Sequence, residues 1–328
     1  MQREIADLTE QAAGYADALD TVRTEMGRVI VGQATAIDRM LAALCANGHI
    51  LLEGVPGIAK TLMVRTLAGC LDCSFARLQF TPDLLPADIT GTKVFNRKDS
   101  TFSTVKGPIF VNFLLADEIN RAPPKVQSAL LEAMQERQVT IQGETLPLVR
   151  PFLVLATENP IESEGTYPLP EAQTDRFMFK VEMGYPTPDD EVEIMNRFTE
   201  EEEIGVGRVL SRDKLTELQA FTRAVYADPA VKRYVAGITH ATRDPSGIGL
   251  DPSDHIRYGA SPRASIYMIL GAKALALMNR RGYVIPEDVR AIAHDVLRHR
   301  IILTYEAEAD GMTPDRAIDD ILRAVPVP

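Results

Sequence analysis

Apolar residues recur at intervals of three and four over the first thirty positions of the chain. One face of an α-helix repeats at this spacing, so residues 1–30 are predicted to form an amphipathic helix. Its apolar face would pack on the protein's own core, although a coiled-coil partner would present the same pattern. The apolar stripe consists of Ile5, Leu8, Ala12, Tyr15, Leu19, Val22, Met26 and Val29.

A different pattern follows between residues 49 and 182, where short apolar runs alternate with helical segments. Runs that are apolar throughout are typical of strands buried on both faces of a parallel sheet. Two further stretches, 94–102 and 139–148, predict inserted β-hairpins that turn at residues 97–100 and at Gly143. The five predicted core strands are His49–Glu53, Ala76–Phe80, Asn112–Ala116, Phe152–Ala156 and Phe177–Val181.

The strand pattern stops after Tyr185, and the rest of the chain reads as helices. Pro262 and Pro286 are good helix starts, because proline suits the first helical position. We therefore expect an N-terminal helix (1–30), an α/β core with a five-stranded parallel sheet flanked by helices (31–185), and a smaller all-helical domain (186–328). The predicted helices of that last part span 188–200, 212–226, 229–243, 262–280 and 287–300.

A glycine-rich loop between the first predicted strand and a helix is the strongest chemical motif. Such loops let backbone N–H groups converge on phosphate oxygens at a helix N-terminus. Lys60 would reach the β and γ phosphates of a nucleotide, and Thr61 would hold Mg²⁺ through its hydroxyl. Ala59 replaces the glycine expected before the lysine, and alanine is tolerable there only if the residue has helical dihedrals. The alternative interpretation of the whole loop is a Gly/Pro turn before a surface helix. The loop consists of Gly54, Val55, Pro56, Gly57, Ile58, Ala59, Lys60 and Thr61.

Two carboxylates end the third predicted strand, at Asp117 and Glu118. Asp117 could bind Mg²⁺ through water, while Glu118 could orient and deprotonate an attacking water molecule. Charged residues at the end of a strand are common in loops. Beside a phosphate loop, however, the pair indicates nucleotide hydrolysis.

Composition limits the function further. The chain has 35 basic and 46 acidic residues, a net charge of −11, which disfavours binding to a phosphate backbone as its main task. With 45% hydrophobic and 25% charged residues it is an ordinary globular protein rather than a disordered or fibrous one. Three cysteines cannot form a disulfide framework, and Cys70 and Cys73 lack the second pair of ligands that a zinc site needs. The polar N-terminus and the absence of an apolar run long enough to cross a membrane predict a cytoplasmic protein.

Four segments resemble the MoxR family of AAA+ ATPases: Gln79–Pro86, Asp117–Met134, Gly165–Gln173 and Gly259–Ala264. The resemblance extends from about Ile30 to Ile302, and the phosphate loop of this family ordinarily carries alanine at the position of Ala59. It implies a five-stranded ATP-binding core with a helical lid. It also implies that the two hairpins are the helix-2 and pre-sensor-1 insertions.

The resemblance assigns roles to further residues. Val31 and Gly32 would lie against adenine with Gln33, and Asn159 would be the first sensor, which positions the attacking water or contacts the γ phosphate. Arg176 would be the arginine finger that acts on a neighbouring subunit's ATP, and Arg263 the second sensor. Asn159 could instead be a turn residue before Pro160, and Arg176 a surface salt-bridge partner. Arg263 opens a helix, where a cation is disfavoured, and this placement favours an anionic ligand.

The function expected from the resemblance is an ATPase ring, a hexamer, that uses ATP and Mg²⁺ to remodel, mature or assemble a client protein. A partner with a von Willebrand factor A domain is implied as well. A nucleic-acid motor is one alternative, since related AAA+ proteins with the same insertions act as helicases. A metal-chelatase motor subunit, which shares the helix-2 insertion, is another. The net charge and the absence of tryptophan disfavour nucleic-acid binding, and only Arg97 and Lys98 at one hairpin tip support it.

Overall fold

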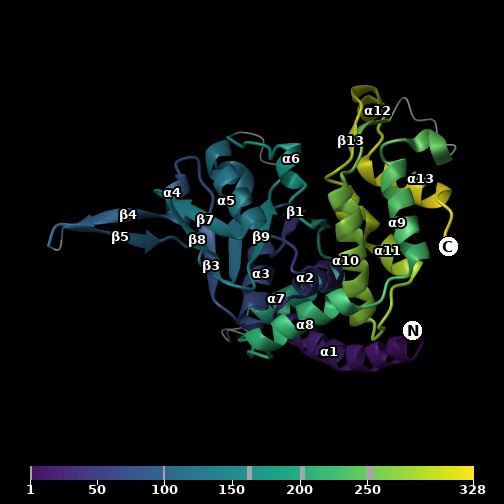
Figure 1. Ribbon diagram of the computed structural model, residues 1–328, viewed down its shortest axis with the longest axis horizontal. Coiled ribbons are helices and arrows are strands. Elements are labelled where there is room, and N and C mark those ends of the chain that lie inside the picture. The colour runs from purple at the N-terminus through teal and green to yellow at the C-terminus, as the bar shows by residue number, and fades with distance from the viewer. Residues whose placement is uncertain (1, 99, 161–164, 200–203, 249–254) are drawn as a thin grey trace.

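Five parallel strands form the central sheet of the computed structural model, which describes residues 2–98, 100–160, 165–199, 204–248 and 255–328 (Figure 1). Their order across the sheet is β10-β1-β9-β6-β3, so the first strand of the chain lies in the interior, with Ile50 opposite both Leu155 and Phe179. All five predicted strands are confirmed, within two residues at each end. They span β1 (Ile50–Gly54), β3 (Phe75–Gln79), β6 (Phe113–Asp117), β9 (Leu153–Glu158) and β10 (Phe179–Met183).

Helices cover both faces of the sheet, which explains the uninterrupted apolar runs. Leu52 and Leu115 belong to a hydrophobic cluster with α1, α2, α3 and the C-terminal helices, whereas Leu51 and Leu114 belong to a second cluster with α4 and α5. Neighbouring residues of one strand therefore enter opposite cores. The helices of this part are α2 (Ala34–Ala46), α3 (Lys60–Cys70), α4 (Pro86–Thr90), α5 (Pro124–Glu136) and α6 (Glu171–Thr174), with a 3-10 turn η1 (Ile119–Arg121).

The N-terminal helix α1 (Gln2–Val29) lies under both parts of the molecule (Figure 1). It packs on α2 and α3 of the core and on α10 of the C-terminal part. Tyr15 stacks on Phe221 of α8 with ring centroids 4.8 Å apart. The buried residues of its apolar stripe are Ala12, Leu19, Val22, Met26 and Val29. The expectation that this stripe packs on the protein's own core is confirmed.

Both predicted hairpins are present, and the first projects far from the core (Figure 1). Phe95 and Phe102 form a cross-strand pair near its tip, and Phe102 is 68% exposed. Asp99, in the predicted turn, lies outside the described residues. Glu144 of the second hairpin accepts a hydrogen bond from Thr104 (3.0 Å) and pairs with Lys93 (3.3 Å), so the hairpins brace each other. They are formed by β4 (Gly91–Asn96) with β5 (Thr101–Lys106), and by β7 (Gln138–Ile141) with β8 (Glu144–Pro147).

The part after β10, which we call the lid, is mainly helical. Pro262 and Pro286 each occupy the first position of a helix, as predicted. The predicted boundary near residue 185 falls between β10 and the first lid helix, and the last residue predicted for that helix, Glu200, lies outside the described residues. The lid helices are α7 (Pro188–Phe198), α8 (Arg212–Ala224), α9 (Pro229–Ala241), α10 (Pro262–Met278), α11 (Pro286–Leu297), α12 (Tyr305–Ala309) and α13 (Pro314–Ala324), with a 3-10 turn η2 (Pro245–Ile248).

The lid is helical, as predicted, and it also takes part in two short strand pairings that were not predicted. β12 (Ile256–Tyr258) pairs antiparallel with β13 (Ile302–Leu303), and β11 (Leu210–Ser211) pairs in parallel with β2 (Leu71–Asp72) of the core. Pairs of two or three residues are too short to produce a periodic pattern. In the described part of the chain, no helix is long and apolar enough to cross a membrane.

The three cysteines are free thiols, as expected from their number. Cys70 ends α3 and is buried in the main core, and Cys73 is partly buried against the same core. Burial raises the pKa of the Cys70 and Cys73 thiols to about 11, so both are protonated at neutral pH. These cysteines therefore fill space in the core, which agrees with the packing role predicted for them.

A buried histidine ties three core elements together. Nε2 of His49 donates to the backbone oxygen of Met134 at the end of α5 (3.2 Å), and Nδ1 accepts from the backbone N–H of Val154 on β9 (2.9 Å). Burial, helped by the nearby Arg137 cation, lowers the pKa of His49 to about 3. The folded protein therefore holds this ring neutral.

Acid should weaken the fold through His49. Its pKa is depressed on folding, so the unfolded chain binds a proton near pH 6.5 that the folded ring binds only near pH 3, and stability falls as the pH drops through this range. Between about pH 7.5 and about pH 5, we expect His49 to lower the free energy of unfolding by about 2 kcal/mol. His49→Gln keeps a donor and an acceptor but does not titrate. Urea unfolding at both pH values should show a smaller acid loss in the variant, and equal losses would contradict the assignment.

Candidate functional site

The phosphate loop follows β1 and opens α3, as predicted. Gly54 leaves no room for a side chain, because a Cβ there would lie 2.4 Å from Cδ1 of Ile58 and 2.8 Å from the backbone oxygen of Met183. Gly57 has a φ of 87°, which favours glycine. The loop thus bends tightly at the carboxyl end of the sheet. The N-terminus of α3, which begins at Lys60, supplies the N–H groups and positive dipole end that suit phosphate.

Ala59 contradicts one expectation. Its dihedrals are φ 65° and ψ 22°, in the left-handed region, and not the right-handed helical values that we took as the condition for alanine here. Alanine adopts this conformation at a cost of about 1–2 kcal/mol, since Cβ approaches the following carbonyl oxygen. The glycine expected by the general motif would relieve that strain. Ala59 therefore marks a strained residue inside the loop.

Ala59→Gly is expected to leave the free energy of unfolding unchanged or to raise it by up to about 1 kcal/mol, because relief of strain offsets the greater freedom of glycine in the unfolded chain. Ala220 is exposed in the interior of α8 and provides the matched control. Ala220→Gly should lower the free energy of unfolding by about 1 kcal/mol. Paired urea unfolding curves measure the contrast, and equal losses would rule out strain at Ala59.

Lys60 reaches back across its own loop. Its Nζ donates to the backbone oxygens of Gly54, of Val55 (3.1 Å) and of Glu158 on the neighbouring strand β9 (3.3 Å). The ammonium group therefore lies at the carboxyl ends of β1 and β9. This is the point where a phosphate held by the loop would meet it.

Asp117 lies at the centre of a polar cluster beside the loop. The Thr61 hydroxyl donates to its carboxylate (3.0 and 3.2 Å), and so does the Thr157 hydroxyl from β9 (2.7 Å). Arg77 of β3 pairs with the same carboxylate at 2.6 Å. The structure thus brings together the two residues predicted to hold Mg²⁺. Hydroxyl and carboxylate oxygens are ligands that Mg²⁺ prefers, and this ion usually takes few protein ligands and fills the rest with water and phosphate oxygens.

Glu118 follows Asp117 in a left-handed conformation, with φ 54°. Its carboxylate accepts a hydrogen bond from Gln79 (2.7 Å) and pairs with Arg121 (3.2 Å). Its backbone N–H donates to the Thr157 hydroxyl (2.8 Å). The side chain is therefore held in place and remains partly exposed at the sheet edge, as a group that acts on water must be.

Asn159 directly follows β9 and is 3% exposed. Its backbone oxygen accepts from the side chain of Asn120 (3.4 Å), and the preceding residue, Glu158, contacts Lys60 through its carbonyl group. Asn159 thus comes to the same edge of the sheet as the phosphate loop and the two carboxylates. Its burial beside this cluster favours the sensor interpretation over a simple turn.

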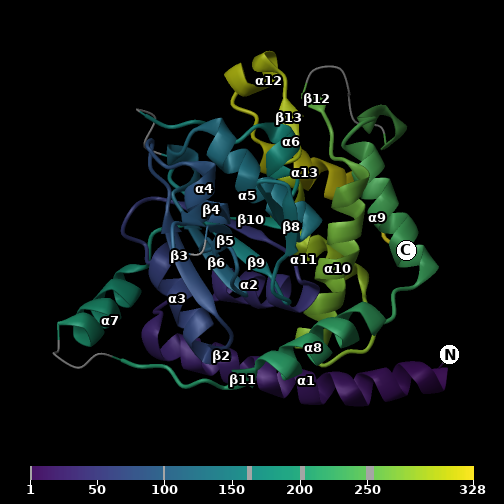
Figure 2. The same ribbon diagram turned by 60° about the vertical axis from the view of Figure 1, so that its left-hand side comes forward.

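A cavity of about 310 Å³ adjoins the phosphate loop. Its walls are largely apolar, which suits the flat face of a nucleobase. Val31 and Gln33, which the family resemblance assigns to adenine, line this cavity, and Gly32 lies beside them with a φ of 65°. Ile194 and Phe198 of α7 also line the cavity, and no motif in the sequence pointed to them. This helix stands apart from the other lid helices (Figure 2). The lining residues are Val29, Ile30, Val31, Gln33, Gly57, Ile58, Ala59, Leu62, Pro186, Ile194 and Phe198.

Arg263 and Arg176 are not beside the phosphate loop. Arg263 opens α10 and pairs with Asp175 of the core at 2.9 Å. Arg176, half-buried, precedes β10, and within the described residues its guanidinium forms no ion pair with a carboxylate. The salt-bridge interpretation of Arg176 therefore gains no support. The structure places both arginines at the contact between core and lid.

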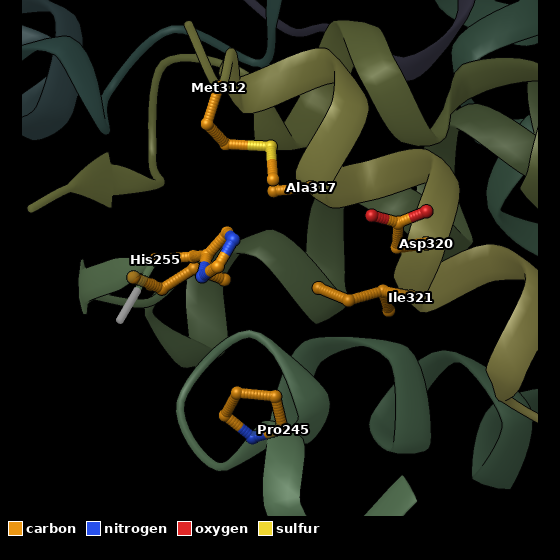
Figure 3. Close-up of a pocket in the computed structure, with 7 residues that line it drawn as sticks. Pro245, His255, Met312, Ala317, Asp320 and Ile321 are labelled. Carbon is orange, nitrogen blue, oxygen red and sulfur yellow. The ribbon is translucent and has the colours of Figure 1, made fainter. Parts of the chain in front are cut away.

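A second cavity lies entirely within the lid (Figure 3). It measures about 230 Å³, and His255 and Asp320 are its ionisable lining residues. Figure 3 shows their side chains on opposite sides, with Met312, Ala317 and Ile321 between them and Pro245 below. None of the predicted site residues lines this cavity.

Comparison with known proteins agrees with the geometry. Residues 49–179 match the model of the ATPase family associated with various cellular activities (AAA), and residues 251–321 match an AAA lid domain. The chain is 49% identical to Chaperone MoxR1 of Mycobacterium tuberculosis, over 97% of this chain and 85% of that protein. It is 32% identical to Protein MoxR of Paracoccus denitrificans, over 98% and 99% of the two chains.

A solved structure shares the whole architecture. The crystal structure of a Cytophaga hutchinsonii protein superposes with a TM-score of 0.92 and 48% identity, over 99% of both chains. The fold, the ATP-binding core and the lid are thus those of one family. The chain belongs to the MoxR family of AAA ATPases and is an ATP hydrolase.

Proposed function

We propose that this ATPase couples hydrolysis of Mg²⁺-ATP in an oligomeric ring to the remodelling, maturation or assembly of a client protein. The observation that carries the proposal is the meeting of the phosphate loop with Asp117 and Glu118 at one edge of the sheet. This edge combines an anion site, a site for a hard cation and a carboxylate that can take a proton from water. Such a set suits cleavage of a phosphoanhydride bond.

Within this site, residues 54–61 cradle the phosphates, and Val31 and Gly32 lie against the base. Thr61 and Asp117 hold Mg²⁺, which when bound neutralises charge on the phosphate oxygens. Glu118 accepts a proton from the attacking water, and Asn159 orients that water or contacts the γ phosphate. Lys60 carries positive charge to the phosphates of its own subunit, and Arg176 carries it to those of a neighbour. Arg263 would have to leave Asp175 before it could reach the phosphates as a second sensor.

Membership of the family supports the proposed ring and client. AAA proteins generally oligomerise, and a finger such as Arg176 has a role only at a boundary between subunits; we propose a hexamer. The name of the relative Chaperone MoxR1 supports action on a protein client. A partner with a von Willebrand factor A domain, as members of this family commonly have, completes the proposal.

The projecting β4–β5 hairpin is the proposed contact with the client. Its exposed apolar residues include Phe102 and Val105, which suit an unfolded or partly folded protein segment. A nucleic-acid motor would need basic groups over a broad surface, but Arg97 and Lys98 stand at the tip of a chain with a net charge of −11. The protein-client hypothesis is therefore preferred to the nucleic-acid and chelatase alternatives.

Glu118→Gln tests the proposed function. The amide cannot accept a proton, so turnover should fall about 10²- to 10⁴-fold while ATP still binds. Phosphate release measures turnover, and a fluorescent ATP analogue measures affinity. Glu136→Gln, an exposed glutamate at the end of α5, is the control and should stay within about twofold of the wild type. Turnover at the wild-type rate in Glu118→Gln would mean that another group activates water.

Glu118→Gln should also retain its client, because a ring that binds ATP without hydrolysing it cannot complete the cycle that releases the client. Protein retained from a cell extract with ATP should leave when ADP replaces it. Phe102→Ser in the Glu118→Gln background should keep nucleotide and ring but retain less client. Undiminished retention would place the client elsewhere on the molecule.

A further inference from the structure

Lid side chains hold the backbone on both sides of Arg176. The carbonyl groups of four consecutive residues, 175–178, all accept hydrogen bonds from the lid. Arg300, at the start of the segment that follows α11, supplies three of these contacts. Its guanidinium donates to the backbone oxygens of Asp175 (2.8 Å), Phe177 (2.5 Å) and Met178 (3.4 Å), and the Tyr267 hydroxyl donates to that of Arg176 (3.3 Å).

The side chain of Asp175 strengthens this attachment. Arg300 Nε donates to its Oδ1 at 2.7 Å, and Ser261 and Arg263 contact the same carboxylate. The Arg300 side chain is 1% exposed, and its guanidinium carbon lies 5.2 Å from the centre of the Tyr267 ring. A buried cation is costly unless it is paired and hydrogen-bonded. Here carboxylate, carbonyl oxygens and aromatic ring together satisfy it.

This arrangement exceeds what attachment of the lid requires. Arg298, two residues earlier, already joins the lid to the core through the backbone oxygen of Lys180 (3.1 Å). Arg300 also donates to the backbone oxygen of Val296 in α11, and its other donors all go to one short segment of the core, which contains Arg176. The planar fork of a guanidinium fixes several acceptors at once, which a lysine ammonium on its flexible stem cannot do.

We propose that Arg300 is a positioning residue for Arg176: it fixes the backbone from which Arg176 reaches the ATP of a neighbouring subunit. The inference rests on the proposed role of Arg176 as an arginine finger. A displacement of about 1 Å from the productive geometry can cost about 10²-fold in rate. Arg300→Lys should therefore lower turnover about 10- to 100-fold and leave the variant's own affinity for ATP within about threefold of the wild type.

Mixed rings separate this role from a general loss of structure. Lys60→Ala should lose its own ATP site but keep its finger, whereas Arg176→Ala should keep its ATP site but lose its finger. If Arg300→Lys impairs the finger, activity should return when it is mixed with Lys60→Ala and should not return with Arg176→Ala. If Arg300 serves only its own subunit's ATP site, the pattern is reversed, and if it serves only the fold, activity returns in neither mixture. Either result overturns the inference.

Two further variants complete the test. Tyr267→Phe removes only the hydroxyl that contacts the carbonyl of Arg176, and it should lower turnover about 2- to 10-fold. Turnover per Tyr267→Phe subunit should rise on mixing with Lys60→Ala and should not rise on mixing with Arg176→Ala. This variant decides the question if Arg300→Lys does not fold. Arg281→Lys changes a lid arginine that is paired with the buried Asp288 at 2.5 Å, and it should stay within about twofold of the wild type.

A reference mixture of Arg176→Ala with Lys60→Ala tests the role of Arg176 as a finger separately from the role of Arg300 as its positioning residue. Return of activity there, with native mass spectrometry confirming mixed rings, supports Arg176 as a finger whatever Arg300 does. No return would remove the finger and this inference with it. Return in the reference alone, with neither Arg300→Lys nor Tyr267→Phe restored by Lys60→Ala, would overturn the inference and leave the proposed function intact.

Discussion

Lys60→Ala should abolish ATP hydrolysis and weaken ATP binding about 10- to 100-fold, the range expected when a charged hydrogen bond is lost. The ammonium group lies at the ends of β1 and β9, within hydrogen-bond distance of the backbone oxygens of Val55 and Glu158. Phosphate oxygens held by the loop would attract it more strongly than these neutral groups do. Calorimetric titration with ATP and a phosphate-release assay measure the two effects.

The control for this variant is Lys232→Ala, an exposed lysine on α9 of the lid. It should leave ATP affinity and turnover within about twofold of the wild type. Thermal unfolding of Lys60→Ala without nucleotide should resemble that of the wild type, since the lost contacts are to backbone oxygens that water can also satisfy. Unchanged affinity and turnover in Lys60→Ala would contradict the assignment of the phosphate loop.

The core could be predicted from sequence because its pattern is local. β6 and β9 are apolar over four successive residues, a consequence of burial on both faces, and in β1 the neighbours Leu51 and Leu52 enter different clusters. The short pairs β2–β11 and β12–β13 could not be predicted, since two residues define no period and their partners are distant in the chain. Helix α13 is different. Ile318, Ile321 and Leu322 carry a helical spacing after Pro314, so this signal was present and was missed.

The residues of the site likewise fall into those that could be predicted from sequence and those that could not. Residues of the phosphate loop, with Asp117 and Glu118, form contiguous motifs whose chemistry can be inferred from their order. Arg77 and Thr157 could not be predicted, because they reach Asp117 only when β3, β6 and β9 pair in register.

The left-handed conformation of Ala59 was also hidden. Side-chain type does not reveal a strained dihedral, and the loop geometry overrides the intrinsic preference of alanine. Arg300 likewise had no role that its sequence context could supply. The role that we propose for it rests on the backbone oxygens that surround it.

The second large effect is expected from Arg176→Ala, which should lower turnover about 10³-fold or more while leaving ATP affinity within about threefold of the wild type. In GTPases, where the contribution has been established, an arginine finger accounts for about 10³- to 10⁵-fold. Arg176 lies before β10 at the contact with the lid, away from the loop that would hold its own subunit's phosphates. Its loss should therefore spare binding. Arg233→Ala, an exposed arginine on α9, should change neither quantity.

The size of the recovery in mixed rings sharpens this prediction. An active boundary needs an intact phosphate loop from an Arg176→Ala subunit and a finger from an adjacent Lys60→Ala subunit. In rings with heterologous contacts and random equal mixing, about one boundary in four meets this requirement, so turnover should rise toward about a quarter of the wild-type value if the boundaries act independently. Recovery should fall as either variant is made the minority. Turnover that stays at the level of the two separate variants, in samples shown to contain mixed rings, would mean that Arg176 does not act between subunits.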